Sequence, residues 1–334
     1  MRREVSRHEI DDAVVSARQP DRGCAGSCAK LSIAIPTYGR GQVLLDTIAT
    51  LVAQEPAAAE VLVVDQTPRH ESHVAQQLAA WHDAGVIRWI RIEQPSVPAA
   101  MNVALRLARQ PIVLFLDDDI RPAPRLIAAH AEGYRDDRVW AIAGQVLQPG
   151  EAPTAAPLAR KRRGIWRDLD FRFWSHQRST VVNCMAGNLS VRRERALELG
   201  GFDENFVGVA YRFETEFARR LVERGGIIQY EPAARIDHLR AARGGTRSHG
   251  NPLRSMSPDH SVGDYYFAIR QAHGAERALY IAARFCRAMR ARYLLTHPWW
   301  IPVRAIAELR GLAWACQLSR KGPKLISATG GERR

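Results

Sequence analysis

Three short apolar runs near the start of the chain, each ended by a polar residue or a proline, restrict the fold more than any other feature. They are 31–35 before Pro36, 61–64 before Asp65, and 112–116 before Asp117. Runs that are apolar at every position are typical of strands buried on both faces, as in a parallel sheet. Helix-like stretches and one shorter strand-like segment lie between them, at 42–53, 70–84, 99–109 and 86–92. The alternation predicts an α/β fold in which helices flank an open, mostly parallel, Rossmann-like sheet.

Polar residues directly after these runs indicate where a ligand would bind. In open α/β sheets, ligands bind outside the carboxyl ends of the strands. Thr37 follows the first run, Asp65 the second, and Asp117, Asp118 and Asp119 the third. Carboxylate oxygens are the ligands that Mg²⁺ and Mn²⁺ prefer, and such an ion can act as a Lewis acid toward a departing diphosphate. Taken alone, a triple aspartate is more often a solvated acidic turn.

Five sequence motifs occur in a fixed order between Leu31 and Arg247. They are LSIAIPTYGR at 31–40, VVDQT at 63–67, FLDDD at 115–119, GNLSVRR at 187–193 and GGFDE at 200–204. Together they resemble the motifs of glycosyltransferase family 2. The resemblance implies a GT-A fold and an inverting transfer of a sugar from a nucleotide-diphosphate donor, UDP- or dTDP-linked, to a glycan or lipid-linked acceptor. It also implies Mn²⁺ or Mg²⁺ as cofactor.

The resemblance also assigns site residues. It places the donor nucleotide at Pro36, Thr37, Tyr38, Asp65, Asp117 and Asp118, the metal at Asp119 and His238, and the acceptor at Gly187, Asn188 and Asp203. Where many relatives have Arg-Asn, this chain has Met101 and Asn102, so the phosphate contacts would move to Arg40 or Arg247. Two simpler interpretations remain open, because Asp65 can be a strand-end turn carboxylate and a lone histidine such as His238 is often structural.

The segment Phe-Glu-Thr-Glu-Phe at 213–217 provides the candidate general base. An inverting transfer is one in-line displacement, so one carboxylate within reach of the acceptor hydroxyl can accept its proton. The family usually has an aspartate at the position of Glu214, preceded by an acid where this chain has Phe213. We therefore predict Glu214 as the base and Glu216 as the second choice. Either glutamate can instead be an ordinary helix-start acid favoured by the helix dipole.

Charge is concentrated in the last part of the chain. The formal net charge is +13, and the segment from Phe267 onward has 13 Lys and Arg against 3 Asp and Glu. We predict a flexible arm over 1–29 and a catalytic domain over 30–250, divided at about residue 120 into nucleotide-sugar and acceptor halves. A basic helical extension over 251–334 would contain helices at 276–295 and 303–318. Such helices can lie on an anionic membrane or pack on the catalytic domain.

Several other classes of protein fit the sequence less well. No run approaches the ~18 apolar residues of a membrane span, and five cysteines are an odd number for a disulfide framework. We therefore expect a cytoplasmic protein, peripheral on the membrane at most. A pI near 10.1 suggests nucleic acid, but no nucleic-acid-binding motif accompanies it, so no such partner is expected. A catalytically silent relative and a nucleotidyltransferase remain as alternatives.

Overall fold

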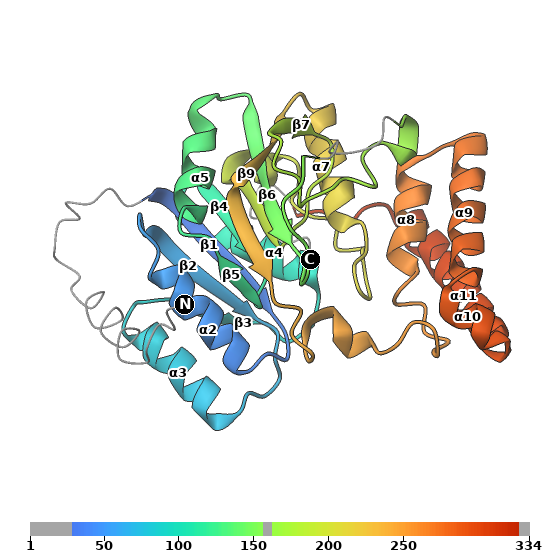
Figure 1. The fold of residues 1–334 in the computed structure, drawn as a ribbon, viewed down its shortest axis with the longest axis horizontal. Coiled ribbons are helices and arrows are strands. Elements are labelled where there is room, and N and C mark those ends of the chain that lie inside the picture. The colour runs from blue at the N-terminus through green and yellow to red at the C-terminus, as the bar shows by residue number, and fades with distance from the viewer. Residues whose placement is uncertain (1–28, 156–161, 327–334) are drawn as a thin grey trace.

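The computed structural model describes residues 29–155 and 162–326, without the side chains of 246 and 247. Within these ranges the chain forms a nine-stranded mixed sheet flanked by helices (Figure 1). The strand order is β3-β2-β1-β4-β8-β6-β9-β5, and β7 also pairs with β9. The strands are β1 (Ala29–Thr37), β2 (Ala58–Asp65), β3 (Arg88–Arg91), β4 (Ile112–Leu116), β5 (Ile120–Pro122), β6 (Val139–Leu147), β7 (Ser179–Val181), β8 (Asn188–Arg192) and β9 (Ile227–His238).

Helices of varied length connect and cover the strands. The α-helices are α2 (Gln42–Val52), α3 (Ser72–Asp83), α4 (Val97–Leu107), α5 (Leu126–Glu132), α6 (Arg193–Glu198), α7 (Phe213–Glu223), α8 (Val262–Gln271), α9 (Gly274–Met289), α10 (Arg292–Thr296) and α11 (Ile301–Arg320). Short 3₁₀ turns are η1 (Gly133–Arg135), η2 (Gly164–Trp166), η3 (Gly245–His249) and η4 (Pro298–Trp300). The α/β fold predicted from the sequence is confirmed. The predicted arm over 1–29 lies outside the described residues except for Ala29, which begins β1.

The three apolar runs of the sequence form the buried centres of β1, β2 and β4. Leu31, Val63 and Leu114 are fully buried. β1 pairs in parallel with both β2 and β4, and β2 pairs in parallel with β3. β4 pairs antiparallel with β8, and in the half of the sheet beyond it the pairs β8–β6, β9–β5 and β9–β7 are antiparallel while β6 and β9 are parallel. Because β1, β2 and β4 run in one direction, the residues after them meet at one edge.

Two strands of the second half complete this edge. β8 pairs antiparallel with β4, with Asn188 opposite Leu116, so the preceding Gly187 lies beside Asp117. The backbone N–H of Asp117 donates to the carbonyl of Gly187 at 3.2 Å. β9 pairs antiparallel with β5, with His238 opposite Ile120, and this pairing brings His238 next to the triple aspartate. Residues far apart in sequence therefore converge on the carboxyl end of β4.

The C-terminal helices lie at one end of the molecule (Figure 1), where α8 packs against α7 and α9 packs against η2. Tyr265, Tyr266 and Phe267 of α8 are almost fully buried, and α8 packs against α11. The hydroxyl of Tyr266 donates to Asp203 Oδ2 at 2.8 Å. The segment predicted as one helix over 276–295 is two helices, because Ala291 has extended backbone angles between α9 and α10. None of the helices in the described part of the chain is long and apolar enough to cross a bilayer.

Candidate active site

A cleft of about 710 Å³ opens at the carboxyl edge of β1 and β4. Its lining includes eight residues that the sequence predicts for donor or metal: Pro36, Thr37, Tyr38, Arg40, Asp117, Asp118, Asp119 and His238. Gln66 and Leu116, which belong to two of the sequence motifs, line it as well, and the remaining lining residues were not predicted, namely Pro95, Ser96, Val97, Ala186, Gly208, Arg240, Gly245, Ser248 and His249. Met101 lines it as well, where many relatives would place an arginine. The structure therefore brings most of the predicted donor residues together.

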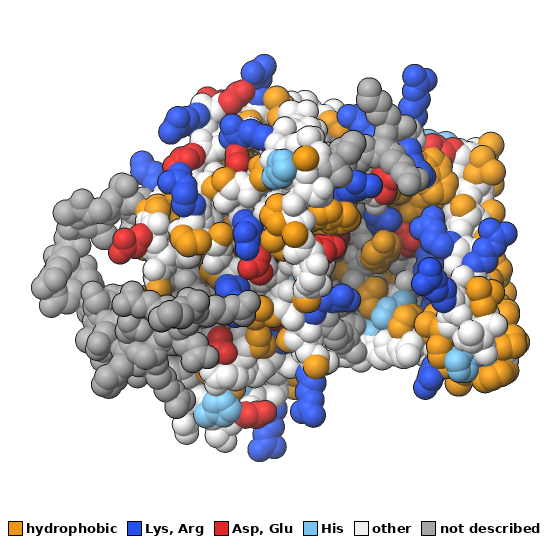
Figure 2. Space-filling view, in the orientation of Figure 1, with side chains coloured by type: hydrophobic (Ala, Val, Ile, Leu, Met, Phe, Trp, Pro, Cys, Tyr) orange, Lys and Arg blue, Asp and Glu red, His pale blue; other side chains and the backbone are white. Residues whose placement is uncertain are grey.

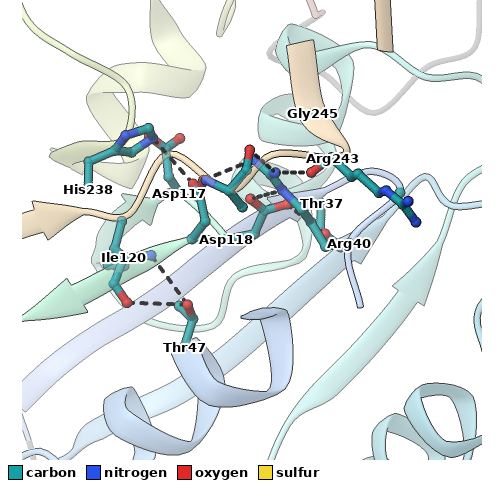
Figure 3. A network of polar contacts seen from close by, with 12 residues as sticks. Thr37, Arg40, Thr47, Asp117, Asp118, Ile120, His238, Arg243 and Gly245 are labelled. Atoms are coloured by element: carbon teal, nitrogen blue, oxygen red, sulfur yellow. Dashed lines mark hydrogen bonds and ion pairs between the residues drawn. The ribbon is translucent and has the colours of Figure 1, made fainter. Parts of the chain in front are cut away.

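Asp117, Asp119 and His238 form the acidic side of the cleft, and Figure 3 shows His238 beside Asp117. His238 Nε2 lies 3.3 Å from Asp119 Oδ1 and 3.6 Å from Asp117 Oδ2. Asp119 is 1% exposed, whereas Asp117 keeps 45% of its side-chain surface open. Burial raises the pKa of Asp119, but the imidazole of His238 and the charge of Arg40 outweigh it, and the pKa is lowered. Asp119 therefore stays ionised at neutral pH.

Arg40 and Asp118 bind each other on the cleft wall. Arg40 Nε donates to Asp118 Oδ1 at 2.8 Å, and Thr37 Oγ1 donates to Asp118 Oδ2 at 2.8 Å. Arg40 also lies 3.2 Å from Asp119 Oδ2 and donates to the carbonyls of Ala241 and Arg243. Burial raises the pKa of Asp118 to about 6 despite the opposing charge of Arg40. Arg40 thus connects the loop after β1 to the loop after β9. Its guanidinium is engaged in these contacts and is not available for the predicted contact with phosphate.

Asp65 is a strand-end turn carboxylate, which is the alternative that the sequence left open, and it does not line the cleft. Its carboxylate accepts hydrogen bonds from Thr67 N at 2.8 Å, His70 Nε2 at 2.7 Å and Trp89 Nε1 at 2.9 Å. The residue is 1% exposed. With both oxygens engaged, Asp65 stabilises the turn after β2, and the next residue, Gln66, faces the cleft instead. The prediction that Asp65 contacts the base of the donor nucleotide is therefore wrong.

Two of the predicted acceptor residues are buried structural groups. Asn188 Nδ2 donates to the carbonyls of Gln145 and Ala234 at 3.0 and 2.8 Å. Asp203 accepts from Tyr266 and, at 2.8 Å, from the backbone N–H of Lys324. Both Asn188 and Asp203 are 0% exposed, so neither can touch an acceptor. The motifs are present, but their polar side chains turn into the protein.

Gly187, the third predicted acceptor residue, has a steric role beside Asp117. A Cβ on Gly187 would lie 2.1 Å from Asp117 Oδ2, much closer than van der Waals contact allows. Glycine at this position therefore lets the aspartate carboxylate lie against the chain that leads into β8. The residue shapes the acidic side of the cleft.

Glu214 stands in the first turn of α7, after a strained segment. Ala210 and Arg212 have positive φ values of 53° and 77°, which are uncommon for residues with side chains and often mark functional sites. Burial raises the pKa of Glu214 to about 7, and the negative charge of Asp117 acts in the same direction, while Arg212 opposes them. Glu214 is not among the residues that line the cleft, and its link to the acidic side is the negative charge of Asp117, which acts on its pKa. A carboxylate with a pKa near neutrality can accept a proton.

The segment that leads to Glu214 lies against the C-terminal helical layer. A Cβ on Gly208 would be 2.6 Å from the carbonyl oxygen of Asp259, and one on Gly263 would be 2.5 Å from that of Tyr211. The backbone N–H of Val209 donates to the same Asp259 carbonyl at 3.1 Å. At both glycines, the backbone of the segment before α7 thus packs directly on the backbone of the C-terminal segment.

Glu216 is a structural residue, and its prediction as an alternative base is wrong. It is 1% exposed and forms a two-pronged ion pair with Arg220, at 2.7 and 2.9 Å. Arg220 in turn donates to the carbonyls of Leu199 and Gly201. Glu216 and Arg220 therefore connect α7 to the turn after α6, and no oxygen of Glu216 is available to an acceptor hydroxyl.

Replacing Glu216 by glutamine should lower stability without removing the chemistry. Glutamine leaves Arg220 without its charged partner, and breaking a largely buried ion pair costs about 3 kcal/mol. We expect a lower free energy of unfolding in urea titrations. At urea concentrations below the unfolding transition, the turnover number should be within a few-fold of that of the wild type. A loss of turnover by orders of magnitude in the folded variant would contradict this role.

Arg240 is the functional candidate that the sequence analysis missed. It lines the cleft directly after β9, is exposed, and forms no hydrogen bond or ion pair with any other described residue. Its φ of 54° is again in the left-handed region. The side chain of Arg247, the predicted alternative, lies outside the described side chains. The backbone N–H of Gly245, two residues before Arg247, donates to the carbonyl of Tyr38 at 2.7 Å and is therefore not available to a phosphate.

Comparison with solved structures identifies the fold. The chain superposes on S. aureus TarS residues 1–349 in complex with UDP-GlcNAc with a TM-score of 0.55 at 14% identity, covering 87% of this chain and 92% of that one. It superposes on the mannosyltransferase PcManGT from Pyrobaculum calidifontis, in complex with GDP-Man and Mn²⁺, with a TM-score of 0.52 at 18% identity, covering 94% and 85%. The fold is that of the GT-A glycosyltransferases.

Sequence comparisons give the family. A validoxylamine A glucosyltransferase of Streptomyces hygroscopicus subsp. limoneus is 30% identical over 118 residues, which are 34% of this chain and 26% of that protein. The match thus spans about a quarter of the length of this curated relative. Residues 32–199, half of the chain, match the model of glycosyl transferase family 2. The chain therefore belongs to glycosyl transferase family 2.

Proposed function

We propose that the protein transfers a sugar from a nucleotide-diphosphate donor, UDP- or dTDP-linked, to a glycan or lipid-linked acceptor in one inverting step. The observation that carries the proposal is the meeting of Asp117, Asp119 and His238 in a cleft at the carboxyl ends of β1 and β4. Membership of the family supports it, as do the UDP-GlcNAc and GDP-Man complexes of two structural neighbours.

The acidic side of the cleft fits a divalent metal. In the described residues, no three His, Cys, Asp or Glu side chains are spaced as a complete site. Mg²⁺-type ions, however, are often bound by one or two carboxylates and completed by water and substrate phosphates. Asp119 Oδ1 is a buried carboxylate oxygen whose neighbour is His238 Nε2, at 3.3 Å. Asp119, His238 and Asp117 would hold Mn²⁺ or Mg²⁺, and the bound ion would supply positive charge to the departing diphosphate.

The residues of the chain would divide the remaining work. Arg240 would bind the diphosphate, because it is the exposed cation of the cleft that has no partner among the described residues. Glu214 would accept the proton of the acceptor hydroxyl as its oxygen attacks the anomeric carbon. The bond from that carbon to the diphosphate oxygen breaks in the same step, so the configuration inverts.

The alternatives make different predictions about the same cleft. A nucleotidyltransferase would use a glycine-rich basic loop after the first strand, but Arg40 in that loop is engaged by Asp118 and Asp119. A catalytically silent relative would bind no nucleotide in a metal-dependent way. The cytoplasmic location and the absence of a nucleic-acid partner remain predictions from the sequence.

A thermal-shift panel tests the proposal directly. The full chain is heated with UDP, dTDP, GDP and ADP, each with Mn²⁺, with Mg²⁺ and with EDTA. We expect one pyrimidine nucleotide to raise the melting temperature only when a metal is present, since a ligand that binds the native state stabilises it by mass action. Stabilisation by none of the nucleotides, or equal stabilisation in EDTA, would overturn the proposal.

Replacing Arg240 by alanine should weaken nucleotide binding about tenfold, since a charge-assisted contact is worth about 1.5–3 kcal/mol and this one is partly solvated. Isothermal titration with the preferred nucleotide and Mn²⁺ gives the dissociation constant. Arg106→Ala is the matched control, because Arg106 is an exposed arginine outside the cleft. Equal affinity in the two variants would exclude Arg240 from the diphosphate site.

A further inference from the structure

The last helix of the described chain has an unusual distribution of side chains. The buried face of α11 carries small and charged residues, namely Arg304, Ala307, Glu308, Gly311 and Ala315. Its exposed positions include a row of apolar residues at a spacing of four, three, four and three, namely Pro302, Ile306, Leu309, Ala313 and Cys316, and beside this row Arg310, Gln317 and Arg320 are also exposed. Ile306 is 41% exposed and Leu309 is 57% exposed. The apolar residues of a surface helix normally face the core. In α11 Leu312, Trp314 and Leu318 pack against the core, but the row that contains Ile306 and Leu309 faces outward.

The buried charges explain how α11 can be held in this orientation. Glu308 is fully buried, accepts from the Tyr265 hydroxyl at 2.7 Å, and is paired with Arg304 and with Arg284, the latter at 3.3 Å. Gly311 packs so closely on α8 that a Cβ would lie 2.1 Å from Ser261 Oγ. Polar contacts and close packing therefore fix the inner face of α11. The outward row of apolar side chains contacts no other part of the described chain closely enough to be buried.

Neighbouring segments extend this apolar surface. The exposed positions of α9 include Ala275, Ala278, Leu279, Ala282 and Cys286, again at helical spacing. Leu295 in α10 and Trp299 in η4 are 67% and 65% exposed. Five of the nine large hydrophobic residues exposed in the described chain thus lie on α9–α11. Figure 2 shows hydrophobic side chains gathered along the right-hand end of the molecule, over these helices.

The same surface is positively charged. Between residues 274 and 320 the exposed charged residues are all arginines: Arg287, Arg290, Arg292, Arg310 and Arg320. The two acids of this segment are occupied elsewhere. Glu276 accepts from the backbone N–H of Ile165 at 2.9 Å, and Glu308 is buried. A partner of this surface must therefore offer both an apolar phase and negative charge.

We propose that the exposed face of α9, α10 and α11 binds the surface of an anionic membrane. Leu279, Leu295, Trp299, Ile306 and Leu309 would enter the boundary between headgroups and acyl chains, while the arginines contact lipid phosphates. A second copy of the chain fits less well, because a two-fold interface pairs a surface with itself and would place five arginines against five. The proposal does not depend on the transferase activity.

Co-sedimentation with vesicles tests the proposal on the full chain. One set contains only phosphatidylcholine, and the other contains equal parts of phosphatidylcholine and phosphatidylglycerol. The variant is the double substitution Ile306→Ser and Leu309→Ser. The control is Leu107→Ser on α4, since Leu107 is 40% exposed and lies outside α9–α11. All three proteins are also sized in solution by light scattering.

We expect the wild type and Leu107→Ser to bind the anionic vesicles and to dissociate as salt is raised. The double variant should bind about tenfold more weakly, because its apolar contribution to interfacial binding is reduced. Absence of binding to anionic vesicles would overturn the proposal, as would equal binding by the double variant. A wild-type dimer that becomes monomeric in the double variant would show instead that a second copy covers this face.

Discussion

Glu214→Gln is expected to lower the turnover number by about 10²–10⁴-fold, the usual contribution of a positioned general base. Glutamine has nearly the same size and cannot accept the proton of the attacking hydroxyl. Turnover is measured as release of nucleotide diphosphate from the donor sugar whose nucleotide the thermal-shift panel identifies. Binding of that nucleotide with Mn²⁺ should be unchanged, which separates a chemical defect from a folding defect. A loss smaller than tenfold would remove Glu214 from the base position.

The pH dependence gives a second test of the same residue. A general base works in its ionised form, and burial raises the pKa of Glu214 to about 7. The ionised fraction therefore grows as pH rises through 7, so wild-type turnover should climb between about pH 6 and 8. In Glu214→Gln this step should disappear and leave a low, flatter profile. A wild-type profile that falls over this range would contradict the assignment.

Asp119→Asn should reduce metal-dependent nucleotide binding by about a hundredfold or more, since losing even an outer partner of a metal ligand costs 10- to 100-fold. Asparagine keeps the size of the side chain but not its charge. Asp118 still holds Arg40, through Nε at 2.8 Å, so the loop after β1 keeps its main anchor. Isothermal titration of the nucleotide with Mn²⁺ and with EDTA gives the effect. Unchanged Mn²⁺-dependent affinity would remove Asp119 from the metal site.

The part of the fold that could be predicted is the part with strong local patterns. The runs at 31–35, 61–64 and 112–116 are apolar at every position, and they form strands within one or a few residues of the expected bounds. The break between α9 and α10 could not be predicted, because neither glycine nor proline accompanies the extended Ala291. The orientation of α11 could not be predicted either, because it follows from the buried contacts of Glu308 and Gly311.

In the site, the sequence predicted where residues lie but not how their side chains are oriented. Strand direction placed Asp117 and Asp119 at one edge, since it decides where strand ends meet, and the family resemblance added His238. Neither could show which way a side chain turns. Asp65, Asn188, Asp203 and Glu216 stand in or beside the expected motifs, yet their oxygens and amides are used within the protein. Arg240 was missed because its exposure and its lack of a partner exist only in three dimensions.

The glycine contacts between the segment before α7 and the C-terminal layer have a further consequence. Every residue that lines the cleft precedes residue 250, so a shortened chain would retain the complete lining. Gly263, however, lets α8 touch the backbone of Tyr211, three residues before Glu214. If Glu214 accepts the proton as proposed, its distance from the donor sugar would be set partly by helices that contact neither, and a displacement of those helices would be transmitted to the reaction itself.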